Sequence, residues 1–192
     1  MTLMNRKQAL TRALQDTEEI VRTAASRALD RIEGLERVQH IFESASSGDK
    51  PRRIRAIHFL GYLNTDESVD LMLTFLQDPE VDIRVATVKA VQTRLPERAM
   101  VPLLGALEDP DVSVVQSVID TLSYYRDPRV TEFLLPFLSS KDAATACVAA
   151  EGLGRNGDPE AEPHLIKVLQ ETPDTYLRVQ AAEALGNLRP NT

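Results

Sequence analysis

Three histidines and one cysteine are the residues of this sequence whose side chains most often serve as metal ligands, bases or nucleophiles. His40, His58 and His164 have apolar or amide neighbours, and none belongs to a His-Glu-x-x-His pattern. Cys147 lies in an apolar run and is expected to be a small buried side chain, because one cysteine cannot form an internal disulfide or a thiolate cluster. We therefore expect no metal, no cofactor and no catalytic residues, so the protein is expected not to be an enzyme.

A binding surface is indicated instead by residues that recur at two adjacent registers of successive helices. The set is His40, Asp70, Leu71, Val101, Pro102, Glu132, Phe133 and His164, with further acidic residues beside it at Glu36, Glu43, Glu67 and Glu160. Leu71, Val101 and Phe133 are apolar where a solvent-facing helix side should be polar. Exposed apolar strips with polar rims usually mark protein contacts. This set is therefore the candidate partner-binding groove for a protein or peptide; the alternative is that its apolar members pack as ordinary core.

Composition and charge narrow the class of partner. The 192 residues are 43% hydrophobic and 27% charged, as in an ordinary soluble globular protein. The formal net charge of −7 opposes attraction to phosphate backbones and anionic membranes, so we expect no nucleic acid and no membrane partner. The sequence has no apolar run of about 18 residues, and its first residues lack the apolar core of a signal peptide. A cytoplasmic location is expected.

The elements that must carry this surface repeat along the chain. A shift of 31 residues aligns the apolar side chains of Leu29, Leu60, Val91, Leu122 and Leu153, and Leu185 follows after one more residue. A second column is mostly small: Ala25, Ala56, Thr87, Val118, Ala149 and Ala181. Small residues are expected where neighbouring helices approach closely. The repeat predicts helical hairpins that bury their apolar faces only by stacking on copies of themselves.

Proline, glycine and aspartate mark the hairpin ends, with Asp78 as the expected cap of a helix that begins at Pro79 and Pro96 as the break inside that hairpin. First helices are expected at 17–32, 51–63, 79–94, 110–125, 142–155 and 174–188, and second helices at 34–45, 66–77, 97–107, 128–138 and 159–170. The prediction is one all-α domain over 1–192, with a capping helix at 3–14, units at 16–45, 48–76, 78–107, 109–138 and 140–169, and a half unit at 172–189. Because the last helix lacks a second helix, we expect self-association or continuation of the chain at the C-terminal end.

Three strings resemble the HEAT-like repeats of phycobilin lyase subunits and of many bacterial proteins: DPEVDIRVATVKAV at 78–91, AAEGLGRNGDPEAEPHLIKVL at 149–169 and LRVQAAEALGNL at 177–188. The resemblance implies a right-handed α-solenoid whose second helices line a concave groove. It also implies a ladder of Asp and Arg side chains between neighbouring units.

The expected ladder pairs Asp16 with Arg22 and Asp78 with Arg84, six residues apart, and leaves Arg53 and Arg178 without a matching aspartate. The arginine column is broken at Val115 and Ala146. The units that start near Asp109 and Asp142 are therefore expected to stack through apolar contacts and to open more easily than the unit at Asp78.

The function favoured by these features is a noncatalytic scaffold that binds a protein or peptide partner in the concave groove. The alternative, from the resemblance, is a phycobilin lyase-like subunit that handles a bilin chromophore. Nucleic-acid binding has the weakest support, because Arg98 and Arg129 in the groove register are outnumbered by acidic residues.

Overall fold

The structure, a computed structural model, describes residues 3–46, 48–63, 65–93 and 97–189, and every regular element in these ranges is helical. The α-helices are α1 (Leu3–Ala13), α2 (Glu19–Ser46), α3 (Lys50–Leu63), α4 (Asp66–Leu73), α5 (Val81–Gln92), α6 (Met100–Gly105), α7 (Val112–Leu122), α8 (Pro128–Leu134), α9 (Ala143–Asn156), α10 (Glu162–Glu171) and α11 (Thr175–Asn187). Short 3-10 turns adjoin them at Thr74–Gln77, Glu97–Ala99, Ala106–Glu108, Ser123–Tyr125, Leu135–Ser139 and Pro159–Ala161. Within these ranges, no helix combines the length and the hydropathy that a membrane span requires.

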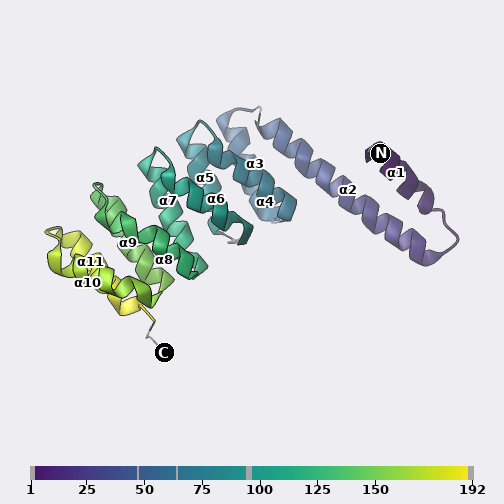
Figure 1. Ribbon diagram of the computed structural model, residues 1–192. Coiled ribbons are helices and arrows are strands. Elements are labelled where there is room, and N and C mark those ends of the chain that lie inside the picture. Colours follow the sequence, from purple (N-terminus) through teal and green to yellow (C-terminus); the bar gives the residue numbers. More distant parts are fainter. Residues whose placement is uncertain (1–2, 47, 64, 94–96, 190–192) are drawn as a thin grey trace.

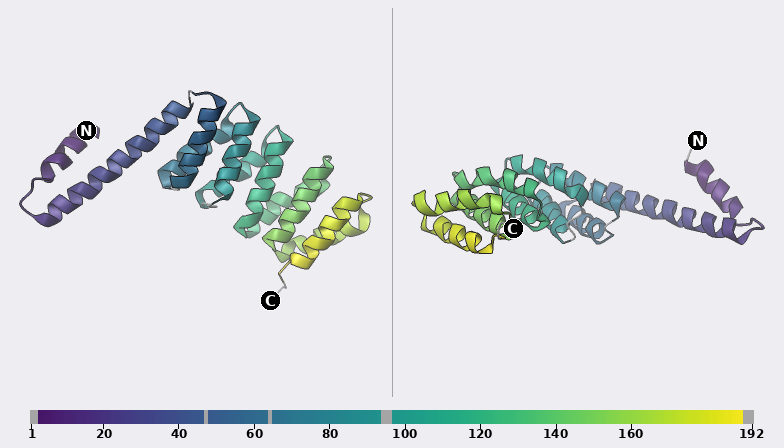
Figure 2. Two further views of the ribbon diagram at one scale, coloured as in Figure 1. Left: turned by 180° about the vertical axis from the view of Figure 1, so that it is seen from behind. Right: turned by 60° about the horizontal axis from the view of Figure 1, so that its bottom comes forward.

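Helices α3 to α11 form a stack of hairpins, as Figure 1 shows. The first helices α3, α5, α7, α9 and α11 each pack against the next first helix along the chain, and the second helices α4, α6, α8 and α10 form a second row. Figure 2 shows the same two rows from behind and from below. The arrangement is an α-solenoid, as the repeat predicts.

Side-chain caps begin several of these helices. The carboxylates of Asp111, Asp142 and Asp174 accept hydrogen bonds from backbone N–H groups in the first turns of α7, α9 and α11. Thr65 and Ser68 form a capping box at the start of α4. Each such cap satisfies a backbone donor that would otherwise lack a partner, and contributes about 1 kcal/mol.

Asp78 does not cap a helix, so that prediction is wrong. Its Oδ1 accepts a hydrogen bond from the backbone N–H of Glu80 at 2.9 Å, and α5 begins only at Val81. The residue before a proline is pushed into an extended conformation, which delays the start of the helix. Asp109 forms the same turn, accepting from the N–H of Asp111 at 2.9 Å. The expected break at Pro96 lies outside the described residues.

The two repeated columns form the centre of the stack. Leu60, Val91, Leu122 and Leu153 are 0% exposed, and at the ends of their column Leu29 and Leu185 are half-buried. The column of small residues is at most 4% exposed at Ala25, Ala56, Thr87, Val118, Ala149 and Ala181. From α3 onward, both columns are therefore confirmed as buried surfaces of the stack.

The first unit departs from the prediction, because α2 is one unbroken helix of 28 residues where a hairpin is expected. In the hairpins of α4, α8 and α10, the second helix or its leading turn is capped by the side chain of Thr65, Asp127 or Asp158. The equivalent position in α2 is Gly34, which has no side-chain oxygen, and Leu35 follows where Asp127 and Asp158 are followed by proline. A glycine inside a helix costs only about 1 kcal/mol relative to alanine, so the helix continues.

The two halves of α2 consequently have different surroundings. Its C-terminal half packs against α3 and α4, in the place of a second helix. Its N-terminal half extends beyond the stack, where α1 lies along it (Figure 1). Ala25 is buried in this projecting part, whereas α1 has no buried residue.

The ladder between hairpins differs from the expected one. Nε of Arg53 lies 3.2 Å from Oδ2 of Asp78, and the guanidinium of Arg84 donates to both carboxylate oxygens of Asp109, at 2.7 and 2.8 Å. The paired residues belong to neighbouring hairpins and are 25 positions apart, so the six-residue pairing is wrong. To Asp78, six residues earlier, Arg84 donates at the backbone carbonyl and not at the carboxylate, and it also donates to the carbonyl of Pro79. The unit at Asp109 is therefore joined by a buried ion pair as well as by apolar contacts.

Candidate functional site

The residues predicted to contact a partner occupy equivalent positions on α2, α4, α6, α8 and α10. We call them the second-helix face: His40, Asp70, Leu71, Val101, Pro102, Glu132, Phe133 and His164. Because they recur at two adjacent registers of stacked hairpins, they follow the row of second helices from one end of the stack to the other.

The apolar members of this face divide into two kinds. Val101 is 71% exposed and Phe133 is 46% exposed, so both side chains leave apolar surface in contact with solvent. Leu71 is half-buried and packs against the core, and Pro102 is also half-buried. Leu71 is thus partly core, whereas Val101 and Phe133 are exposed.

One polar member of this face, Asp70, takes part in an ion pair that connects two neighbouring hairpins. Nη1 of Arg98 donates to Oδ2 of Asp70 at 2.7 Å and to the backbone carbonyl of Asp66 at 2.9 Å. This interaction links the turn before α6 to α4, one helical turn from Val101. It therefore limits how far the exposed Val101 can move relative to α4.

Arg129, the second basic residue of this region, is bound within its own turn. Its Nη2 donates to Oδ2 of Asp127 at 2.7 Å and its Nε to Oδ1 at 3.0 Å. These bonds from the Arg129 side chain, with one from its backbone N–H, lower the pKa of Asp127 below its ordinary value. Arg98 and Arg129 are thus both paired with carboxylates and do not present unneutralised positive charge to a phosphate backbone.

The rim of the second-helix face is acidic. Glu67, Asp70, Glu132 and Glu160 are exposed. Residues 64–192 hold 21 acidic and 11 basic side chains, a net charge of −10. A partner segment that carries basic residues beside an apolar anchor would be electrostatically complementary to this face.

The described residues contain no group of three or more His, Cys, Asp or Glu side chains placed to hold a metal ion. Burial raises the pKa of the half-buried Cys147 thiol, with a further contribution from the Asp174 carboxylate. A thiol with a raised pKa is a poor nucleophile because less of it is ionised at neutral pH. His40, His58 and His164 are all exposed, on α2, α3 and α10.

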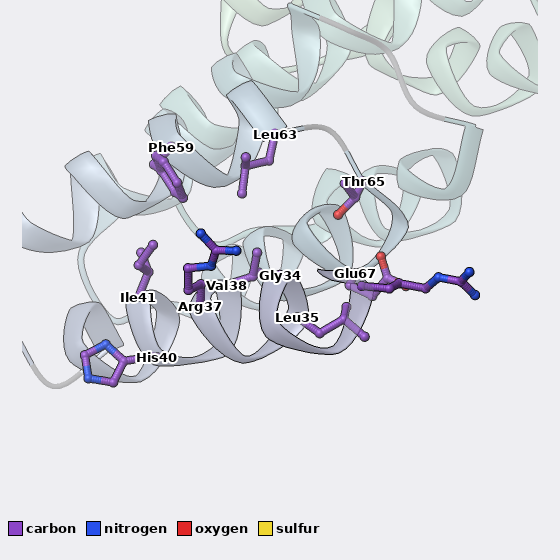
Figure 3. Close-up of a pocket in the computed structure, with 11 residues that line it drawn as sticks. Gly34, Leu35, Arg37, Val38, His40, Ile41, Phe59, Leu63, Thr65 and Glu67 are labelled. Carbon is purple, nitrogen blue, oxygen red and sulfur yellow. The ribbon is translucent and has the colours of Figure 1, made fainter. Parts of the chain in front are cut away.

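A pocket that the sequence analysis missed lies where α2 meets α3 and α4. We call it the junction pocket; it has a volume of about 520 Å³ and its apolar lining is Leu35, Val38, Ile41, Phe59 and Leu63. In Figure 3 the side chains of Phe59 and Leu63 point from α3 toward α2, and the guanidinium of Arg37 lies between the two helices. His40 of the second-helix face also borders it.

The junction pocket exists because no first helix precedes α3. In later hairpins the position of Phe59 is occupied by small buried residues, namely Ala90, Thr121, Gly152 and Ala184. Phe59 itself is 40% exposed. The large residue in a column of small ones was the sequence signal that could have revealed this uncovered surface.

Repeated hairpins, a buried column of small residues and a ladder between units define an α-solenoid. A family model of HEAT repeats matches residues 38–123 and, again, residues 100–186. The chain belongs to the HEAT-repeat proteins.

Solved structures agree with this fold. A chain of the complex of CpcE and CpcF of phycocyanin lyase from Nostoc sp. PCC7120 is similar with a TM-score of 0.65 and 21% identity, over 79% of this chain and 64% of that chain. The protein YibA of E. coli gives a TM-score of 0.57 with 19% identity, over 97% of this chain and 71% of that one. An engineered protein gives 0.53 with 17% identity, over 97% and 96%. No curated protein matches the sequence. Likeness at these identities concerns the fold alone.

Proposed function

We propose that this protein is a noncatalytic scaffold that binds a protein or peptide on its second-helix face. The observation that carries the proposal is the exposure of Val101 and Phe133 on adjacent second helices, within an acidic rim. Exposed apolar side chains surrounded by polar ones are typical of protein contacts. The family resemblance makes this face the concave one, which would surround an extended segment or a helix of the partner.

The partner is expected to present an apolar side chain next to basic residues. Phe133 would be its principal contact, because aromatic anchors often dominate binding energy. Val101 would lie beside it, kept near α4 by the Arg98–Asp70 pair.

Partner capture from native lysate tests the proposal, followed by affinity measurement with the captured protein. Phe133→Ala should weaken binding by more than about 1 kcal/mol, a factor of roughly five. Val112→Ala is the matched control, since Val112 is 48% exposed on a first helix. Equal affinities for the wild type and the Phe133→Ala variant would remove this face from consideration.

A second candidate is a phycobilin lyase-like subunit that handles a bilin chromophore. The similarity to a chain of the CpcE and CpcF complex favours it. Coexpression with an apo-phycobiliprotein and a bilin discriminates between the two, because covalently bound colour is expected only for the second candidate.

A further inference from the structure

The outer side of α11 is a surface that the earlier first helices of the stack bury. One column of first-helix residues is 0% exposed at Ile57, Val88, Ile119 and Ala150. The next member of this column is Ala182 on α11, which is exposed. Val179 is 46% exposed, whereas the equivalent positions of α3, α5 and α9 hold half-buried residues that pack against the core: Ile54, Val85 and Cys147. Among the described residues, no helix covers this apolar side of α11.

The outer side of α3 is uncovered at the other end of the stack. Phe59 is 40% exposed there and lines the junction pocket together with Leu63. Helix α1 does not cover it, because Leu3 borders Asp70 and Leu71 of α4 instead. The C-terminal half of α2 therefore stands in the place of a second helix, and among the described residues no first helix precedes α3 in the stack.

At two crossings of neighbouring first helices, α3 with α5 and α9 with α11, a glycine of one helix faces an alanine of the next; the hairpins of α5 and α7 have Gln92 and Ser123 in the glycine register. A Cβ built on Gly61 would be 3.5 Å from Cβ of Ala90, and one built on Gly154 would be 2.8 Å from Cβ of Ala184. The contact at Gly61 would be an ordinary one, whereas a Cβ at Gly154 would force α9 and α11 apart. At the α9–α11 crossing, the small size of the facing pair therefore allows the close approach of the two helices.

The two uncovered surfaces carry the residues for another crossing of this kind. Gly186 occupies the position on α11 that Gly61 and Gly154 occupy on α3 and α9. No atom lies within 4 Å of a Cβ built on Gly186. Phe59 occupies the position on α3 that Ala90 and Ala184 occupy on α5 and α11. A glycine, the smallest residue, opposite Phe59 leaves the most room for its ring. Within one chain, the residue in the glycine register before α3 is Asp30. Its carboxylate would be buried against the ring without a partner, which disfavours closure by the chain's own residues.

The two segments of the chain that carry these surfaces differ in net charge. Residues 1–63 hold 11 basic and 8 acidic side chains, a net charge of +3, against −10 for residues 64–192. Arg52 and Arg55 are exposed on α3, at positions that are buried or half-buried in every later first helix. Glu183 is exposed on α11, next to Ala182. Contact between the two surfaces would bring the basic residues toward the acidic end of the stack.

We propose that copies of this chain associate head to tail, with α11 of one copy lying against α3 and the C-terminal half of α2 of the next. In this arrangement α11 takes the position of a first helix, and α2 of the other copy serves as its second helix. Gly186 lies opposite Phe59, and the stack of hairpins continues across the contact. Because the two contacting surfaces differ, the contact can repeat, and it gives longer rows of copies or a closed ring.

Sedimentation velocity over a range of protein concentrations tests the proposal. The wild type should form dimers and larger species as its concentration rises. Gly186→Arg obstructs the α11 surface and Phe59→Arg obstructs the α3 surface, so each should raise the dissociation constant at least about tenfold. Val112→Arg, a substitution of an exposed valine on α7, is the control and should associate as the wild type does. Circular dichroism checks that each variant remains helical.

Mixing the two variants separates a head-to-tail contact from a symmetric one. Gly186→Arg retains the α3 surface and Phe59→Arg retains the α11 surface, so an equal mixture should form a 1:1 dimer and nothing larger. A symmetric contact through either surface would not be restored by mixing. A wild type that is monomeric at every concentration, or a mixture that shows no dimer, overturns the proposal.

Discussion

The substitution Gly154→Ala tests the close stacking of α9 on α11. A Cβ at this position would lie 2.5 Å from Cα of Ala184 and 2.8 Å from its Cβ. Carbon atoms in favourable contact are about 3.5–4.0 Å apart, so the two helices would have to separate by about 1 Å. Overpacking of this kind costs about 1–3 kcal/mol, and the better helix propensity of alanine returns about 1 kcal/mol. Since the contact is with backbone, which cannot rotate away, the cost lies in the upper part of that range, and we expect a net loss of about 1–2 kcal/mol.

Gly34→Ala is the matched control, because no atom lies within 4 Å of a Cβ built at Gly34 in the middle of α2. At Gly34 the substitution brings only the higher helix propensity of alanine, so the Gly34→Ala variant should be more stable than the wild type by up to about 1 kcal/mol. Urea unfolding followed by circular dichroism measures both, with the slopes compared to detect uncoupled unfolding of the repeats. If Gly154→Ala stabilises the protein as Gly34→Ala does, the close approach of α9 and α11 is refuted. A destabilising Gly34→Ala would refute the unbroken α2.

Other expectations concern the ladder. Asp109→Asn should cost about 3 kcal/mol, since it leaves the buried Arg84 without its carboxylate. Burial is the largest influence and would raise the pKa of Asp109, but the bonds and charge of Arg84 and the bond from the backbone N–H of Asp111 together lower the pKa below the ordinary 3.8. The carboxylate therefore stabilises the fold above that value and ceases to do so as pH falls through the lower folded pKa; unfolding of wild type and variant between pH 7 and 2 should show this difference shrinking. Hydrogen exchange should report easier opening between α7 and α9 than between α5 and α7, because Val115 replaces the ladder arginine and Gln116 donates only to the exposed Asp142 and to Thr145. Equal protection at the two interfaces would contradict it.

The candidate binding surface was partly predictable. The register of second helices identifies Val101 and Phe133 as apolar residues on a solvent side, and both are exposed in the structure. It could not separate them from Leu71, which has the same sequence character but packs against the core. Periodicity indicates the side of a helix on which a residue lies, whereas the burial of its side chain depends on the size of the neighbouring side chains in the adjacent hairpin.

Periodicity shows only that Phe59 is a large residue in a column of small ones, and it does not show that a pocket opens beside it. Residues 17–32 carry the columns of a first helix, including Ala25 and Leu29, so they were expected to stack on α3. Whether they do so depends on Gly34 at the expected turn and on the fit of Asp30 against Phe59. The roles of Gly34 and Asp30 are recognised only when equivalent positions of the hairpins are compared in three dimensions.

By itself, the sequence determined that this protein is a stack of helical hairpins and which columns are buried. Those properties depend on spacing along one helix, where residues three or four apart must share a face. The tertiary structure alone decided that α2 remains straight, that Arg84 binds Asp109 rather than Asp78, and that a pocket opens beside α3. These depend on the offset between neighbouring hairpins and on whether two side chains fit at a crossing, and no pattern within a single helix contains that information.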